Sequence, residues 1–137
     1  MTYSVIFLWS YFIAEEEIRS HDYKIINEKK TWRVASTHCW KINGELVSIK
    51  SKAEQNYIEE ITDKKHDFWI GFSNANGART PVWSDGESLH YKNFNEDAGE
   101  EIDEKCYFVS NRDIGLWTAA SCLDKKPFIC KVPSKFF

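Results

Sequence analysis

The sequence predicts an α+β fold, with two helices in the first half of the chain and antiparallel strands with long loops in the second half. Apolar residues recur at helical spacing as far as Ile61, whereas from Phe68 onward short apolar runs are separated by turns rich in Gly, Asn and Asp. Helices followed by strands, rather than a regular alternation of the two, indicate this class and not a doubly wound sheet. Four cysteines add an expectation of two disulfides.

The first half opens with an expected strand at residues 23–27, followed by a turn at 28–30. Thr31 can then cap a helix, because its hydroxyl can accept a hydrogen bond from a free N–H of the first turn. The apolar positions of this helix recur at helical spacing and are Trp32, Ala35, Cys39 and Ile42. Gly44 is expected to end the helix.

A second helix is expected to begin after Ser51, beyond a short strand at residues 46–49. Ser51 and Glu54 have the spacing of a capping box, in which the hydroxyl accepts from the third helical N–H and the carboxylate reaches back to the N–H of Ser51. The buried face of this helix is predicted to be Tyr57, Ile58 and Ile61.

The second half is predicted to contain only strands and loops. The strands are expected at residues 68–72, 81–83, 89–91, 106–110, 114–118 and 127–132. Trp69, Trp83 and Trp117 lie on these strands and are therefore expected in the core, whereas Trp40 is expected to be half exposed. Residues 95–105 show no apolar periodicity, and long loops of this kind in compact domains are often binding loops.

Composition favours one globular domain. The chain has 137 residues, of which 42% are hydrophobic and 15% aromatic, and a chain of this length is expected to form a single core. A net charge of −3 without a basic stripe argues against nucleic acid, or an anionic membrane surface, as the main partner. The sequence lacks a close cysteine pair of the Cys-x₂-Cys type, which a zinc site would need. The even cysteine count therefore favours disulfides and an oxidising compartment. The residues alone leave three pairings open.

The N-terminus adds a second indication of the compartment. Residues 3–14 are almost wholly apolar and are followed at once by three glutamates. This run is too short to span a membrane but fits the apolar region of a signal peptide. We interpret residues 1–14 as a signal peptide, with cleavage expected near residues 10–15. The alternatives are a buried strand of the mature domain and the end of a truncated membrane anchor.

Several segments, taken together and in order, resemble the C-type lectin-like domain in its short form with two disulfides. They are a Trp-bearing first helix with a cysteine (32–39), Gly-x-Leu-x-x-Ile (44–49), Trp-Ile-Gly (69–71), Trp-x-Asp-Gly (83–86) and Phe-Ile-Cys (128–130). The resemblance covers residues 22–133, which leaves residues 15–21 as a short N-terminal segment.

The resemblance implies that Cys39 pairs with Cys130 and Cys106 with Cys122. It also implies an extracellular, non-catalytic recognition protein that binds a glycan or a protein through its long-loop face. The chain is then expected to be secreted, or alternatively to be the ectodomain of a membrane protein. A structural or inhibitory interaction subunit without sugar binding is a further alternative. The domain itself is not expected to insert into a membrane.

The calcium site of sugar-binding members of this family is only partly matched. Those members hold the ion with a proline-containing triplet, an acidic residue near the third cysteine and a Trp-Asn-Asp triplet, and Ca²⁺ needs 6–8 oxygen ligands. Here the last triplet reads Trp117-Thr118-Ala119, and residues 95–105 contain no proline. Glu104 keeps a ligand position, but Lys105 brings a positive charge beside it. At an auxiliary site, Asn74 and Ala78 stand where ligands are expected. No cofactor is therefore expected to be required, and calcium is expected to bind weakly.

An acidic run lies in the same loop and has two interpretations. It concentrates six carboxylates within nine residues, namely Glu96, Asp97, Glu100, Glu101, Asp103 and Glu104. Charge runs are usually solvated loops, and we favour that interpretation. There are two functional alternatives, because a cation would relieve the repulsion between the carboxylates. One is an improvised calcium site, which would make the protein a calcium-dependent lectin. The other is a docking site for a basic partner.

Catalytic chemistry is not indicated. The four histidines are His21, His38, His66 and His90, and they lack metal-ligand spacing. No Gly-x-Ser-x-Gly elbow, phosphate-binding glycine loop or His-Glu-x-x-His motif occurs. The sequence therefore predicts a binding protein and not an enzyme.

Overall fold

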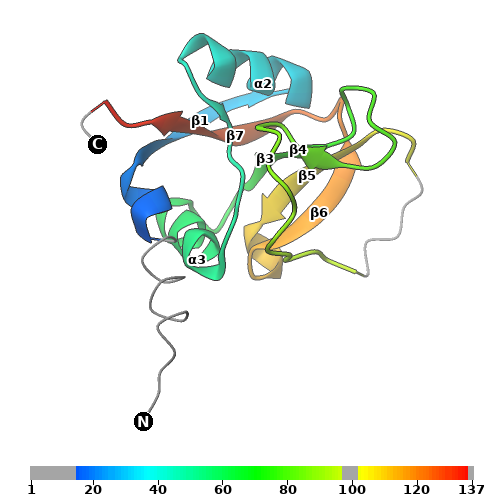
Figure 1. Cartoon of the computed structure of the whole chain (residues 1–137). Coiled ribbons are helices and arrows are strands. Elements are labelled where there is room, and N and C mark those ends of the chain that lie inside the picture. The colour runs from blue at the N-terminus through cyan, green and yellow to red at the C-terminus, as the bar shows by residue number, and fades with distance from the viewer. Residues whose placement is uncertain (1–14, 97–101, 136–137) are drawn as a thin grey trace.

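A mixed sheet of seven strands organises the protein, and the predicted α+β class is confirmed. The computed structural model describes residues 15–96 and 102–135 (Figure 1). The strands are β1 (His21–Lys30), β2 (Glu45–Leu46), β3 (Asp67–Ser73), β4 (Val82–Trp83), β5 (Lys105–Ser110), β6 (Leu116–Ser121) and β7 (Lys126–Pro133). Their order is β1-β7-β3-β5-β6, while β2 pairs with β7 and β4 with β3. The β3–β7 pair is parallel, and the other strand pairs are antiparallel.

Two helices lie on either side of the segment that carries β2. Helix α2 spans Trp32–Lys41, helix α3 spans Lys52–Ile61, and residues 15–19 are also helical. Figure 1 shows α2 above the middle of the sheet and α3 below, with the chain between them running across the front. Within residues 15–96 and 102–135, no helix has the length and apolarity that a membrane crossing requires.

Both helices begin after the predicted caps, but the start of α3 and the end of α2 each differ in one detail. Ser51 accepts from the Glu54 N–H at 3.1 Å, but the Glu54 carboxylate reaches one residue further back than expected, to the Lys50 N–H at 2.8 Å. Helix α2 ends at Lys41, and the left-handed residue after it is Asn43 (φ 66°) rather than Gly44. Gly44 has a different role: a Cβ there would lie 2.7 Å from the Lys131 carbonyl oxygen, so the absence of a side chain lets this segment approach β7. Ile42 lies beyond the helix and is 38% exposed.

Several predicted strands differ from the observed ones. Residues 28–30 continue β1 instead of turning, because Lys30 pairs with Lys126 across an irregularity in the ladder. Residues 47–49 are not a strand, although the Val47 N–H still donates to the Ile129 carbonyl oxygen at 3.0 Å. Residues 89–91 are also irregular, because the backbone of Trp117 bonds instead to residues 93 and 95.

The last boundary difference occurs before β6. Asn111–Asp113 forms a 3₁₀ turn, and both Ile114 (φ 58°) and Gly115 (φ 73°) are left-handed, so the strand begins only at Leu116. A left-handed conformation is unfavourable for a β-branched residue such as isoleucine.

Buried tryptophans fill the core, as predicted for Trp69, Trp83 and Trp117, which are at most 2% exposed. Their polar edges are largely satisfied: Nε1 of Trp69 donates to the Lys30 carbonyl oxygen at 2.9 Å, and Nε1 of Trp117 donates to Oε1 of Gln55 at 2.8 Å. A buried indole N–H normally needs such a partner. Trp40, in contrast, is 73% exposed, more than the half exposure expected.

Both disulfides are present in the pairing that the resemblance implied. Cys39–Cys130 joins α2 to β7 across 91 positions, and Cys106–Cys122 joins the ends of the β5–β6 hairpin across 16 positions. All four cysteines are buried. The first bridge therefore connects the two halves of the domain, whereas the second stabilises one hairpin.

A buried ammonium group connects β7 to α3. Lys131 is only 5% exposed, and its Nζ lies 2.7 Å from Oε2 of the fully buried Glu54. The same carboxylate oxygen accepts a hydrogen bond from the Tyr23 hydroxyl at 2.5 Å. Burial, and then the negative charge of Glu54, raise the pKa of Tyr23 well above its ordinary value, so the hydroxyl remains a donor. Buried charges require this kind of pairing and hydrogen bonding.

The N-terminal segment is attached to the same ammonium group. Oε1 of Glu17 lies 2.6 Å from Nζ of Lys131 and 3.2 Å from Nζ of Lys50. Burial raises the pKa of Glu17, but the hydrogen bond and charge of Lys131, with those of Lys50, outweigh this effect and hold it below its ordinary value. Residues 15–20 are therefore part of the folded domain. The expected signal peptide, residues 1–14, lies outside the described residues.

The first testable prediction compares the two disulfides. Replacing Cys39 and Cys130 together by alanine should lower the free energy of unfolding by ~4–5 kcal/mol, and replacing Cys106 and Cys122 should lower it by ~3 kcal/mol, because the longer closed loop restricts the unfolded chain more. Urea denaturation of the two double variants measures the difference. A larger loss from the hairpin bridge would contradict it.

The second prediction concerns Glu17. Because its pKa is lowered in the folded state, its charged form contributes stability that is fully present above the ordinary value of 4.5 and disappears as the pH falls through the lowered value. Glu17→Gln should cost about 1–2 kcal/mol at neutral pH, since Lys131 keeps Glu54 as a partner. The cost should shrink below about pH 4.5. Urea denaturation against pH measures it, with the exposed neighbour Glu16→Gln as the control. An equal cost for both variants, or one that does not depend on pH, would contradict the role of Glu17.

Candidate functional site

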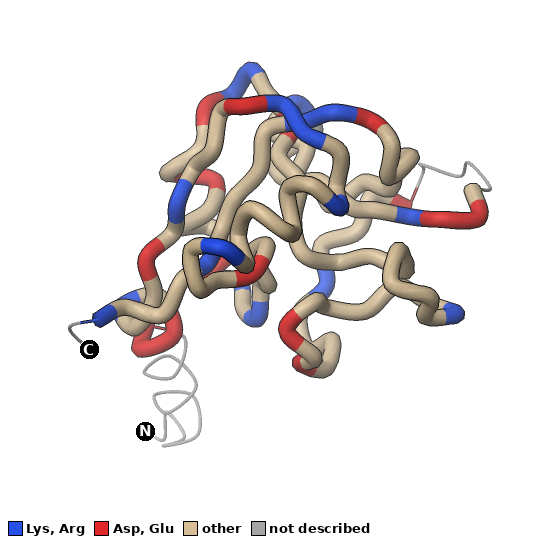
Figure 2. The backbone as a smooth tube through the Cα atoms, turned by 90° about the horizontal axis from the view of Figure 1, so that it is seen from above, with Lys and Arg blue, Asp and Glu red and all other residues tan. Residues whose placement is uncertain are grey.

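The acidic run lies at one edge of the molecule, where β5 begins. Asp103 and Glu104 are exposed, and Figure 2 shows acidic positions in red beside the undescribed trace. Glu96 is also exposed, on the other side of the gap. Asp97, Glu100 and Glu101 lie outside the described residues. The proposed ligand loop therefore remains a prediction, and only its two ends can be placed.

Asn74 connects the end of β3 to residues 103–105, where the acidic run ends and β5 begins. Its Oδ1 accepts from the Lys105 N–H at 2.7 Å, and its Nδ2 donates to the Asp103 carbonyl oxygen at 3.1 Å. The backbone N–H of Asn74 also donates to the Lys105 carbonyl oxygen at 3.1 Å. Both ends of the amide are thus engaged with backbone groups. In this arrangement the side chain acts as a cross-link between two loops.

The carboxylate of Glu104 has a basic neighbour from α2. Nη2 of Arg33 lies 3.4 Å from Oε1 of Glu104, and the same guanidinium donates to the Ala75 carbonyl oxygen. Both charged side chains are more than half exposed, so the ion pair is worth little energetically. Its geometric consequence is larger, because a positive group lies against the one carboxylate that was expected to keep a calcium-ligand position.

The positions of the Trp-Asn-Asp triplet, which were expected to supply further calcium ligands, lie on β6. Thr118 pairs with Phe108 and Ala119 with Tyr107 in the β5–β6 ladder. The Thr118 hydroxyl oxygen is buried without a hydrogen-bond partner, and Ala119 offers no ligand atom. Across residues 15–96 and 102–135, no three His, Cys, Asp or Glu side chains are grouped so as to hold a metal ion.

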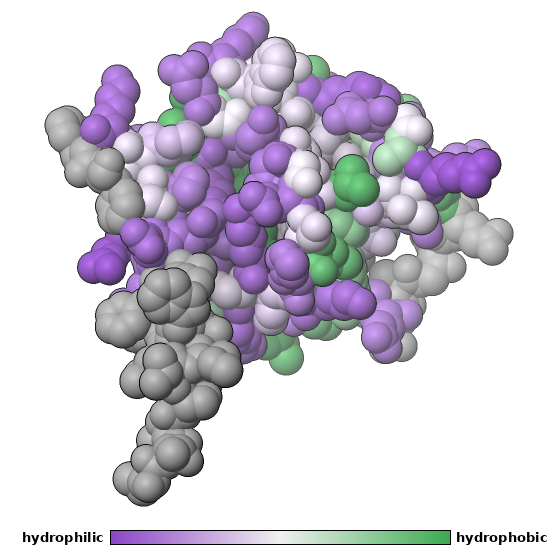
Figure 3. Space-filling view, viewed as in Figure 1, coloured by the Kyte–Doolittle hydropathy of each residue, from purple (hydrophilic) through white to green (hydrophobic). Residues whose placement is uncertain are grey.

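A pocket of about 510 Å³ opens on a different part of the surface, between the N-terminal segment, the C-terminal end of α2 and β7. Figure 3 shows that hydrophilic side chains predominate on the face between α2 and α3. The lining includes the exposed Trp40 and the charged groups Glu17, Glu45, Lys50, Asp85 and Lys131. A second hollow, of about 280 Å³, shares Trp40 and Glu45 with the first. These two residues therefore lie between the hollows.

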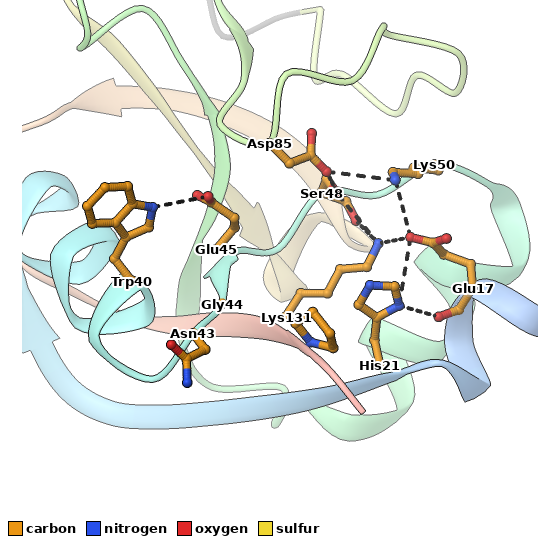
Figure 4. A pocket seen from close by; sticks show the side chains of 11 residues that line it. Glu17, His21, Trp40, Asn43, Gly44, Glu45, Ser48, Lys50, Asp85 and Lys131 are labelled. Atoms are coloured by element: carbon orange, nitrogen blue, oxygen red, sulfur yellow. Dashed lines mark hydrogen bonds and ion pairs between the residues drawn. The ribbon is translucent and has the colours of Figure 1, made fainter. Parts of the chain in front are cut away.

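Lys50 is at the centre of an ion-pair network at one end of the pocket. Its Nζ lies 3.2 Å from Glu17 and 3.8 Å from Asp85 (Figure 4), and it also lies 3.7 Å from Glu87. Burial lowers the pKa of Lys50, but the surrounding carboxylates, Glu17 foremost, raise it above its ordinary value. Asp85 also accepts a hydrogen bond from the Ser48 hydroxyl at 2.6 Å. The lysine is thus held charged and is shared among three carboxylates.

Trp40 and Glu45 form the other end of the pocket. Nε1 of Trp40 donates to Oε1 of Glu45 at 3.2 Å, and Figure 4 shows the indole turned toward this carboxylate. Burial, and to a lesser degree the charge of Asp85, raise the pKa of Glu45, although the hydrogen bond from Trp40 opposes the change. Within the described residues, no basic side chain forms an ion pair with Glu45.

Sequence reasoning did not identify this pocket, although two signals pointed to it. Trp40 falls off the apolar register of α2, which places a large aromatic ring on the polar side of the helix. Lys131 interrupts the apolar run of β7, and a lysine in such a position needs a buried acidic partner. The pocket itself could not be inferred, because its walls come from segments far apart in the chain.

Comparison with known proteins identifies the fold family. The model of the lectin C-type domain matches residues 28–132. The chain is 31% identical over 121 residues to the snaclec bitiscetin subunit alpha of Bitis arietans, across 82% of this chain and 88% of that protein.

Solved structures show the same likeness. A calcium-independent type II antifreeze protein superposes with a TM-score of 0.74 at 26% identity, across 83% of this chain and 87% of that one. The C-type lectin domain of murine dendritic cell inhibitory receptor 2, solved in complex with N-glycan, has a TM-score of 0.75 at 25% identity, across 85% and 93%. The match of the family model, the paired disulfides and the shared fold lead to one conclusion: the chain belongs to the lectin C-type domain family.

Proposed function

We propose that this protein is an extracellular, non-catalytic recognition protein that binds a glycan or a protein through its long-loop face without depending on calcium. The observation that supports this proposal most directly is the set of hydrogen bonds that Asn74 makes with the C-terminal end of the acidic run. Asn74 joins the end of β3 to residues 103–105 through both ends of its amide. These contacts hold residues 103–105 beside the end of β3, which supports binding on this face without calcium.

The ligand positions support the same proposal. Ca²⁺ in proteins takes 6–8 oxygen ligands, and each lost carboxylate weakens the site. Ala119 supplies none, Lys105 places an ammonium where a second carboxylate would help, and Arg33 lies against Glu104. An ion at this place would have to displace or tolerate two positive groups, which is electrostatically unfavourable.

The disulfides and the relatives support the compartment and the ligand classes. Two disulfides are typical of proteins that fold in an oxidising compartment, which favours an extracellular location. The similar antifreeze protein is described as calcium-independent, and the similar murine receptor domain was solved with an N-glycan. We infer that the same fold in this chain can present a glycan- or protein-binding face without the ion.

A second candidate function is that of a structural or inhibitory subunit in a larger assembly. The similar bitiscetin chain is named as a subunit, and a second relative at 33% identity is the alpha subunit of alboaggregin-A of Trimeresurus albolabris. A subunit of this kind would bind protein and no sugar. The acidic run keeps a third alternative, a calcium-dependent lectin, open to test.

A glycan array, run once with calcium and once with a chelator, tests the proposed function. We expect the same pattern of bound glycans in both conditions, or no glycan bound in either, in which case the ligand is a protein. Binding that appears only with calcium would overturn the proposal and favour the calcium-dependent lectin. Protein with both disulfides reduced serves as the unfolded control.

Thermal unfolding gives an independent prediction for calcium. A site with these ligands should have a Kd of about 10⁻³ M or weaker, so ~1 mM calcium stabilises the protein by less than about 0.5 kcal/mol. The melting temperature should then rise by no more than about 2 °C. Glu104→Ala should change this rise little, with the exposed Glu28→Ala as the matched control. A rise of about ten degrees that Glu104→Ala abolishes would show that the acidic run is a working calcium site.

A further inference from the structure

The pocket beside α2 is separate from the long-loop face and has an unusual composition. It combines a cavity of about 510 Å³ with an exposed indole ring and several carboxylates. Trp40 is 73% exposed even though other tryptophans of the domain, such as Trp32 and Trp69, are at most 1% exposed. An aromatic side chain that borders a concave pocket beside a few well-placed polar groups is a frequent feature of binding sites.

The orientation of the ring is fixed by its polar edge. Nε1 of Trp40 donates to Oε1 of Glu45 at 3.2 Å, and Glu45 is held in turn by the pairing of β2 with β7. The hydrogen bond occupies only the edge of the indole, so the faces of the ring stay available to a ligand. The ring and the carboxylate thus form one preorganised unit, and organisation before binding lowers the entropic cost of association.

The charges around the pocket are unbalanced. Five carboxylates (Glu17, Glu45, Glu54, Asp85 and Glu87) surround two ammonium groups, Lys50 and Lys131. Each lysine already forms ion pairs with at least two of these carboxylates. Within the described residues, Glu45 has a hydrogen bond from Trp40 but no cationic partner. An added cation would therefore meet an attractive field at Glu45.

We propose that this pocket binds a basic side chain of a protein partner, in which a guanidinium group stacks on the Trp40 ring and pairs with the Glu45 carboxylate. Arginine fits better than lysine, because its planar group stacks on aromatic faces and presents several donors to a carboxylate. A neutral sugar can also stack on an aromatic ring, but it would leave the excess negative charge uncompensated. The second hollow, which also borders Trp40 and Glu45, leaves room for the chain on either side of the basic residue.

The test uses nuclear magnetic resonance of the whole folded protein, with the indole N–H signal of Trp40 as the reporter. The probes are N-acetylarginine amide and N-acetylcitrulline amide, which have similar shapes but differ in charge. We expect arginine amide to shift the Trp40 signal with a Kd of about 1–10 mM and citrulline amide to bind at least about fivefold more weakly, because a charge-assisted contact is lost.

Two variants separate the proposed contact from a general effect of charge. Glu45→Gln keeps the size of the side chain and its hydrogen bond to Trp40, and should weaken arginine amide about fivefold or more. Glu28→Gln removes a carboxylate that is 71% exposed on β1, away from the pocket lining, and should leave the affinity unchanged. Circular dichroism of each variant confirms that the fold is intact.

Any one of four results would overturn the proposal. Equal affinity for arginine and citrulline amides, or full affinity in Glu45→Gln, would show that the positive charge is not recognised. A larger Trp40 shift with methyl glycosides than with arginine amide would make the pocket a carbohydrate subsite. No shift with any probe at concentrations up to about 50 mM would show that the pocket binds none of them.

Discussion

The domain depends on the pairing of the Lys131 ammonium with the Glu54 carboxylate inside the protein. Lys131 lies on β7, which also pairs with β1, β2 and β3, so a charge on this strand without a partner would destabilise the part of the sheet that the other strands share. Glu54 is placed for the contact by its position in the first turn of α3, where it also accepts from the Lys50 backbone. One contact between opposite charges therefore fixes a helix, the segment that precedes it and a central strand relative to one another.

The sequence was informative where the determinants are local. The capping pair Ser51 and Glu54, and the apolar spacing of Trp32, Ala35 and Cys39, depend on residues a few positions apart, and both helices began where they were expected. Strand edges were less predictable, since β1 continues to Lys30 only because Lys126 lies opposite it. Residues 89–91 have strand-like composition, but the backbone of Trp117 already bonds to residues 93 and 95.

The candidate sites were also predictable from the sequence only where their features are local. The prediction of weak calcium binding could be drawn from Ala119 and Lys105, because a missing carboxylate is visible in the sequence itself. The contact of Arg33 with Glu104 and the pocket beside Trp40 could not, since each unites side chains from distant segments. The attachment of residues 15–20 was missed for this reason: Glu17 has no local signal, and its partner Lys131 lies near the other end of the chain.

The Asn74 cross-link has a consequence for the behaviour of the protein in acidic compartments. A metal site held by carboxylates releases its ion when those ligands take up protons, which can loosen the loops that the ion held together. The amide of Asn74 has no proton to gain or lose in this range, and its partners are backbone groups. The hydrogen bonds that connect β3 to residues 103–105 should therefore remain intact at the low pH of an acidic compartment.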